Sequence, residues 1–215
     1  TEETTVKLIW TVTPATYDMS NVRFERAAYE FTYNGQQQRP SVVGDLPVGL
    51  DGIAVTVTYR GGATHVSDGE QTVTAVFSTT SKNYTFADGA NKLTATVKIL
   101  PYEIEEIVWT QQKHFTFNGE DQSASVLARY EAIDGRMVPL ALEEVAFTDY
   151  REGGYAFTVT GFTAADNRNG NYVLGETVQK QETYFIDKMQ VTVAVGDQSA
   201  VYTGQAAQLS SEAGS

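Results

Sequence analysis

His65 has the most potentially reactive groups near it in the sequence, because Ser67, Asp68 and Glu70 follow it in the stretch "GATHVSDGE". A histidine with a serine and a carboxylate is the set of groups that a hydrolytic triad or an acid–base pair uses. Such groups rarely neighbour one another on a single loop, because they normally converge from separate elements. The stretch therefore predicts a polar loop and no catalytic site.

The other acid–base candidates also lack partners. His114 directly precedes a strand-like run, where an exposed edge position is the ordinary expectation. Glu105–Glu106 and Glu143–Glu144 are adjacent pairs, and adjacent residues of a strand point to opposite faces. The chain contains no cysteine, which excludes a thiolate nucleophile and cysteine-ligated zinc. We therefore predict a protein that is not an enzyme, with no catalytic, cofactor-binding or metal-binding residues and no cofactor.

A calcium site is the alternative to consider for the stretch "DNRNGN" (166–171), which is rich in side-chain oxygens. Calcium takes six to eight oxygen ligands. The stretch lacks the closing bidentate glutamate of an EF-hand loop, and the corresponding "TSKNYTF" in the first half has no acidic residue. We therefore expect a polar turn that leads into Tyr172. The oxygen-bearing side chains are Asp166, Asn167, Asn169 and Asn171.

A Lys–Asn isopeptide bond is a further possibility. Lys98 or Lys188 could supply the amine, but such a bond also needs an asparagine on an adjoining strand and a buried carboxylate between them. We expect no such bond, and intact mass is the direct check because each bond releases one ammonia.

The two tryptophans stand in similar runs, "LIWT" at 8–11 and "IVWT" at 107–110. Exposed aromatic faces can bind sugars by stacking. Repetition at equivalent places instead favours a role in the core or at a domain junction, which is our prediction for Trp10 and Trp109.

Composition narrows the class of protein. The chain has 215 residues, 41% of them hydrophobic, so packed cores are expected. The formal net charge of −12, with no lysine or arginine cluster, argues against binding to nucleic acid and to anionic membranes. No stretch approaches the roughly 20 apolar residues of a membrane span. The lack of cysteine is typical of bacterial or cytosolic proteins.

Alternation with a period of two predicts β-strands along most of the chain. Examples are "VTVTY" (55–59), "TVTAVF" (72–77), "LTATVKI" (93–99) and "FTVTGF" (157–162). Asn-Gly and Asp-Gly pairs between them are typical of tight turns. The best helical candidate, "NVRFERAAYEF" (21–31), is short. The predicted fold class is all-β.

The sequence also repeats itself. "FTYNGQ" (31–36) returns as "FTFNGE" (115–120) and more weakly as "VYTGQ" (201–205). Gly119 lies 84 positions after Gly35, and Gly204 lies 85 positions after Gly119. Tyr84 and Tyr172 occupy matching places near the end of each copy. A fixed interval of this length indicates tandem structural units.

The predicted boundaries are residues 1–101 for the first unit, 102–189 for the second and 190–215 for the truncated start of a third. Between Trp10 and Gly35 lie 24 residues, but between Trp109 and Gly119 only nine. The first unit is therefore predicted to carry an insertion of 15 residues. The short junction "KILPYEIEE" contains one proline and predicts a limited range of angles between the units. The start of the third unit is expected to dock on the second unit or to pair with another molecule.

The motifs "FTYNGQQQRP" (31–40), "FTFNGEDQ" (115–122), "YFIDKMQVTV" (184–193) and "AVYTGQ" (200–205) resemble the MBG-type repeats of bacterial surface proteins. Family members commonly have a proline a few residues after the glycine. Pro40 matches it in the first unit, whereas the second unit has Ser-Ala-Ser there. The resemblance implies tandem Ig-like β-sandwich domains and brings no catalytic residues.

The expected function is a non-catalytic spacer or stalk segment of a large bacterial cell-surface or secreted adhesin-like protein, located outside the cell. Neighbouring repeats of the same polypeptide are the expected partners, with a host or cell-surface glycan or protein as a further possibility. The alternative is a carbohydrate- or protein-binding module, which would need a patch of exposed aromatic residues. Its candidates are Tyr17, Tyr29, Tyr59, Tyr150 and Tyr155.

Overall fold

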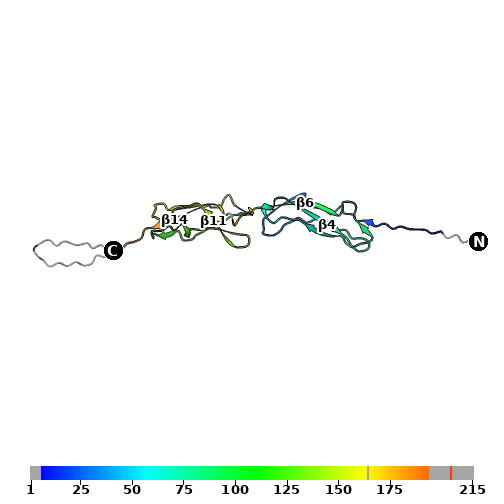
Figure 1. Cartoon of the computed structure of the whole chain (residues 1–215), viewed down its shortest axis with the longest axis horizontal. Helices are drawn as coiled ribbons and strands as arrows, with labels where there is room; N and C mark the ends of the chain where they lie inside the picture. Colours follow the sequence, from blue (N-terminus) through cyan, green and yellow to red (C-terminus); the bar gives the residue numbers. More distant parts are fainter. Residues whose placement is uncertain (1–5, 164, 194–203, 205–215) are drawn as a thin grey trace, which may run out of the picture.

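The computed structural model describes residues 6–163, 165–193 and 204. The described chain is elongated, with two β-rich halves placed end to end (Figure 1). The N-terminal half comprises residues 15–100 and the C-terminal half residues 101–187. No α-helix occurs among the described residues, so the all-β prediction is confirmed and the architecture is β-sandwich-like. Within the same residues, no helix has the length and apolar character to cross a membrane.

Fourteen strands and two short 3₁₀ helices make up the described secondary structure. The N-terminal half contains β1 (Ala15–Thr16), β2 (Ala28–Thr32), β3 (Thr56–Arg60), η1 (Val66–Asp68), β4 (Gln71–Ser78), β5 (Tyr84–Thr85) and β6 (Lys92–Leu100). The C-terminal half contains β7 (Tyr102–Ile104), β8 (Val108–Trp109), β9 (His114–Thr116), η2 (Ser123–Ser125), β10 (Ala128–Glu131), β11 (Met137–Leu142), β12 (Tyr155–Phe162), β13 (Tyr172–Leu174) and β14 (Gln181–Asp187).

The last strand of each half lies in the interior of a sheet. In the N-terminal half the order is β2-β6-β4-β3, so β6 pairs in parallel with β2 and antiparallel with β4. In the C-terminal half the order is β8-β10-β11-β12-β14-β9, so β14 lies between parallel β9 and antiparallel β12. Two further parallel pairs, β1-β5 and β13-β7, complete the halves.

Each half has its own hydrophobic clusters, because the alternating strands place one set of side chains inward. In β4 the inward residues Val73, Ala75 and Phe77 are buried. The two buried clusters of the N-terminal half consist of residues between 17 and 99. The buried cluster of the C-terminal half consists of residues between 104 and 186. The largest fully buried side chains are Tyr130, Tyr184, Phe147 and Phe157, all in the C-terminal half.

The repeated Asn-Gly pairs form equivalent turns, as the sequence predicts. Gly35 and Gly119 have φ of 79° and 80°, in the left-handed region that favours glycine. The asparagine before each glycine accepts the N–H two residues further on, at 2.9 Å in both halves. Gly204 has φ of 80° as well. The remainder of the predicted third unit beyond Val193 lies outside the described residues.

The matching tyrosines also have matching contacts. The hydroxyl of Tyr84 accepts the N–H of Leu50 at 3.1 Å, and the hydroxyl of Tyr172 accepts the N–H of Ile133 at 3.2 Å. Each of these tyrosines begins a short strand paired in parallel with the first strand of its half. The predicted correspondence between the two positions is confirmed.

The correspondence between Trp10 and Trp109 is wrong. The N–H of Thr110 donates to the carbonyl of Leu127 at 2.9 Å, and the equivalent bond in the N-terminal half runs from Arg23 to Val43 at 3.1 Å. The counterpart of Trp109 is therefore the residue before Arg23, which is buried Val22.

The size of the predicted insertion changes for the same reason. Twelve residues separate Val22 from Gly35, against nine between Trp109 and Gly119. The first half therefore carries three extra residues here, and not 15. The tryptophan in "LIWT" belongs to a different part of the repeat from Trp109, although the two runs look alike.

Replacement of Gly61 by alanine should destabilise the N-terminal half more than replacement of Gly69. Both glycines have positive φ, so each alanine costs about 1 kcal/mol in backbone strain. A Cβ at Gly61 would also lie 2.2 Å from the carbonyl oxygen of Thr72, whereas nothing lies near one at Gly69. Gly61→Ala should cost about 1–3 kcal/mol more in urea unfolding. Equal losses would contradict the close approach.

The C-terminal half should lose stability at alkaline pH. Burial raises the pKa of Tyr130 to about 12, above the value of about 10 for an unfolded tyrosine. Tyr130 ionises only in the unfolded state between these values, so its contribution to the free energy of unfolding should be constant below about pH 10 and fall towards pH 12. Urea titrations across this range measure it. Tyr130→Phe should make the fall shallower, and an unchanged slope would contradict the assignment.

Candidate functional site: the junction between the two halves

The junction begins with a direct connection between two strands. β6 ends at Leu100, Pro101 follows, and β7 starts at Tyr102. The N–H of Tyr102 donates to the backbone carbonyl of Asn171 at 2.8 Å, which aligns β7 with the strand that starts at Tyr172. A single residue between two hydrogen-bonded strands leaves little freedom for the chain at this point.

Asn171 is the one polar side chain that is buried in the described part of the chain, at 7% exposure. Its Oδ1 accepts the N–H of Val66 at 3.1 Å, from the other half. Its Nδ2 lies 2.9 Å from Nδ1 of His65. An amide nitrogen can only donate, so this imidazole nitrogen is the acceptor. The carbonyl of Asn169 adds a third bond by accepting the N–H of Ser67 at 3.1 Å.

The loop that receives Asn171 is held by Asp68. The Asp68 carboxylate accepts the N–H groups of His65 and Thr64, both at 2.8 Å. These two bonds keep the pKa of Asp68 below its usual value, with the His65 N–H contributing most. The loop continues into η1 and ends at Gly69, whose φ is 66°. The loop that sequence analysis considered for catalysis is thus a structural support for the junction.

Aromatic rings fill the space beside this polar contact. Tyr33 of the N-terminal half packs edge-on against Tyr172 of the C-terminal half, with 5.5 Å between ring centroids. Tyr33 also stacks on the ring of His65 at 6.1 Å. Burial raises the pKa of Tyr172. A Cβ added at Gly35 would lie 3.6 Å from Cγ2 of Ile133. The first Asn-Gly turn therefore approaches the other half.

The polar stretch 166–171 is a turn, and the side chains of Asp166, Asn167 and Asn171 are hydrogen-bonded within it or at the junction. Asn167 bonds both the N–H and the carbonyl of Tyr172, at 3.0 and 2.8 Å. Asp166 accepts a hydrogen bond from the hydroxyl of Thr163. Among the described residues, no group of three or more histidine, cysteine, aspartate or glutamate side chains is arranged to hold a metal ion.

The two tryptophans have different environments. Trp109 is 8% exposed and its indole N–H points to the carbonyl of Gln179 at 3.4 Å, so the prediction of a core role is confirmed. Trp10 is 82% exposed, so it lies in neither core of the described halves, and a role at a domain junction stays a prediction for this residue.

Lys98 and Lys188 lack the surroundings of an isopeptide bond. Lys98 is exposed and pairs across the sheet with Glu30. The ammonium of Lys188 lies 4.3 Å from the ring centroid of Tyr150. No carboxylate is buried among the described residues.

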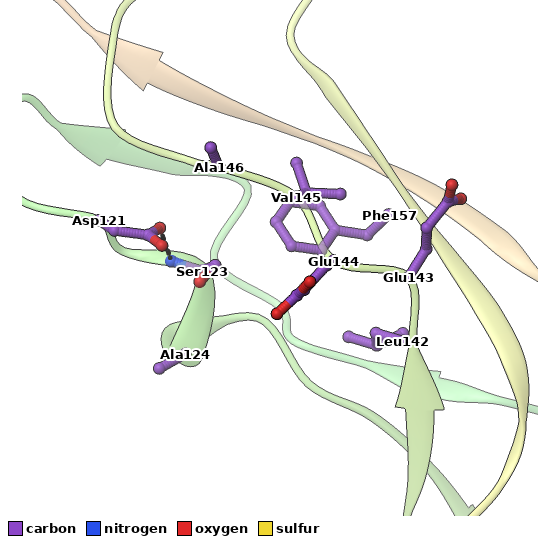
Figure 2. Close-up of a pocket in the computed structure, with 9 residues that line it drawn as sticks. All are labelled: Asp121, Ser123, Ala124, Leu142, Glu143, Glu144, Val145, Ala146 and Phe157. Carbon is purple, nitrogen blue, oxygen red and sulfur yellow. Dashed lines mark hydrogen bonds between the residues drawn. The ribbon is translucent and has the colours of Figure 1, made fainter.

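Both glutamate pairs lie just outside strands, so the expectation that strand geometry separates them is wrong. Glu143 and Glu144 follow β11 and line one open hollow of about 570 Å³ together with Asp121. Figure 2 shows their carboxylates pointing apart, with that of Glu144 on the side of Ser123. Asp121 accepts the N–H groups of Ser123 and Phe147, which lower its pKa. That carboxylate therefore organises the loop.

The aromatic residues considered for ligand binding do not form one exposed patch. Tyr17 is buried, and its hydroxyl donates to the carbonyl of Ile53 at 3.0 Å. Tyr29, Tyr59 and Tyr155 are half-buried. Tyr150 is half exposed, beneath Lys188.

Sequence reasoning did not find the junction residues. His65 was considered only for catalysis and Asn171 only for calcium, and 106 positions separate them. The signal in the sequence was the Asn-Tyr pair, which recurs at 83–84 and 171–172. In the structure the backbone carbonyls of Asn83 and Asn171 both accept the N–H that starts the first strand of their half, at 2.8 Å. Asn83 is exposed, whereas Asn171 is buried by the neighbouring half.

No protein-family model matches the chain, and searches of curated proteins and of solved structures likewise give no match.

Removal of the Asn171 side chain should loosen the junction. Asn171→Ala leaves the N–H of Val66 without its partner, which we expect to cost about 1–3 kcal/mol. Hydrogen exchange at the Val66 amide should become faster. Asn83→Ala is the matched control, because the same side chain is exposed there and should change stability by less than about 0.5 kcal/mol. Unchanged exchange in Asn171→Ala would contradict the role of this contact.

Proposed function

We propose that this chain is a non-catalytic spacer segment of a bacterial cell-surface or secreted protein, built from tandem Ig-like β-sandwich units. The observation that carries the proposal is the junction, where the one buried polar side chain of the described residues connects the two halves. A spacer needs units that fold on separate cores, and it needs junctions that resist bending.

The separate cores support the first requirement. Each hydrophobic cluster draws its buried residues from one half. The equivalent turns and tyrosine contacts in the two halves support the idea that one structural unit is repeated.

The junction supports the second requirement. Hydrogen bonds to buried groups depend on direction and are costly to leave unmade, so bending at Asn171 would expose or orphan its partners. The short connection through Pro101 also resists bending, because the proline ring fixes the backbone angle φ of that residue. The net charge of −12 favours a spacer that does not self-associate.

The alternative of a sugar- or protein-binding module is less well supported. Its candidate tyrosines are separated, and one of them, Tyr17, is buried. The acidic hollow near Glu144 has its carboxylates pointing apart (Figure 2). No observation on the described residues favours a binding function over the spacer.

A spacer predicts a narrow distribution of distances between the two halves. The chain has no native cysteine, so Thr56→Cys and Thr177→Cys, both at exposed positions, place one spin label in each half. Pulsed electron paramagnetic resonance should give a single narrow distance peak. The peak should broaden when Asn171→Ala is added and stay narrow when Asn83→Ala is added.

A broad distribution in the parent chain would contradict the spacer, because the halves would then be freely jointed. Saturable binding to a glycan array, or turnover in a broad hydrolase screen, would contradict its non-catalytic, non-binding character.

A further inference from the structure

Residues 6–13, "VKLIWTVT", form the most exposed apolar segment of the described chain. They extend away from the N-terminal half without a paired strand (Figure 1). The exposed fractions are 78% for Val6, 68% for Leu8, 82% for Trp10 and 93% for Val12. Four large apolar side chains at every second position are typical of a strand with one face in a core.

The repeat fixes which strand this segment corresponds to. Ala15 and Tyr102 are equivalent, since each starts a parallel strand by donating its N–H, at 2.8 Å, to the carbonyl of the corresponding asparagine. Counting back from each, Pro14 matches Pro101 and Thr13 matches Leu100. Residues 6–13 therefore match residues 93–100, which form the last strand of the N-terminal half, β6.

The second half gives the same alignment. The N–H of Tyr33 donates to the carbonyl of Leu100 at 2.8 Å, and the N–H of Phe117 donates to that of Asp187 at 2.9 Å. Leu100 and Asp187 are therefore equivalent, and residues 7–13 match β14, residues 181–187.

The alternation of apolar residues in the segment matches the alternation of buried residues in both β6 and β14. Val97 and Ile99 in β6, like Tyr184 and Ile186 in β14, are buried with at most 1% exposure. The positions that match them in the segment are Trp10 and Val12. The other face, Lys7, Ile9, Thr11 and Thr13, matches the positions of β6 that are exposed or partly buried.

Trp10 has chemistry suited to the place of Tyr184. The Tyr184 ring lies 5.5 Å from that of Phe157, beneath the ammonium of Lys113 at 4.3 Å. Its hydroxyl donates to the carbonyl of Thr110 at 2.9 Å. An indole offers a buried ring, an N–H donor and the most favourable aromatic face for a cation.

We infer that residues 6–13 are the closing strand of a β-sandwich unit of this same fold, and that their partner is such a unit lacking its own last strand. The partner presents an apolar groove between the counterparts of β9 and β12, with unpaired backbone groups on both sides. The inference rests on the proposed tandem function and names the contact that continues the array.

The continuity of the junction supports this partner over an unrelated one. β6 continues through Pro101 into β7, and residues 6–13 continue through Pro14 into β1 in the same way. A closing strand is hydrogen-bonded on both edges, so a unit that lacks it leaves two edges open. Addition of the segment would satisfy both edges and bury its four apolar side chains.

Transplantation within the full chain tests the inference. In one chimera residues 7–13 replace residues 181–187, and in a second residues 6–12 replace residues 93–99; both keep the observed phase. Matched controls insert the segment shifted by one residue, so that Lys7, Ile9 and Thr11 face inward. Hydrogen exchange of the transplanted strand and urea unfolding of the recipient half are measured.

We expect at least one in-phase chimera to fold, with exchange in the transplanted strand slowed on the order of 100-fold relative to its shifted control. Failure of both in-phase chimeras to fold, or equal protection in phase and out of phase, would overturn the inference. Neither of these results would alter the distance distribution between the two native halves, so the proposed function stands or falls separately.

Discussion

The central constraint on this structure is the position of the last strand of each half. β6 and β14 are hydrogen-bonded on both edges, and their inward side chains are among the most buried in the described chain. A strand in this position cannot be removed without opening a sheet and a core together. Because β6 continues directly into β7, the element that completes one half also fixes where the next half begins.

The junction follows from that constraint. Once β7 is paired with β13, Asn171 is carried to the end of the N-terminal half, beside His65 and Val66. A buried amide has to be paired, and here both ends of the side chain bond the neighbouring half. The contact between the rings of Tyr33 and Tyr172 buries apolar surface, and such burial does not depend on a fixed direction as a hydrogen bond does. The hydrogen bonds of Asn171 set the geometry of the junction, and the aromatic contact adds buried apolar surface.

The same residues have different roles in the two halves because their neighbours differ. Asn83 and Asn171 make equivalent backbone contacts, yet Asn83 bonds the carboxylate of Asp51 at the surface whereas Asn171 is buried against another half. Leu50 and Ile133 are equivalent as well, at 99% and 39% exposure. Repetition in the sequence thus sets the backbone, while the presence of a neighbour decides what is buried.

The sequence by itself determined the all-β class, the Asn-Gly turns and the correspondence of Tyr84 with Tyr172, because alternation and turn chemistry are local properties. It misplaced Trp10, since "LIWT" and "IVWT" look alike but occupy positions that do not correspond in the repeat. Only the tertiary structure decided that His65 and Asn171 meet across 106 positions. Contact between residues so far apart depends on how sheets pair and how the halves join, and no local pattern records it.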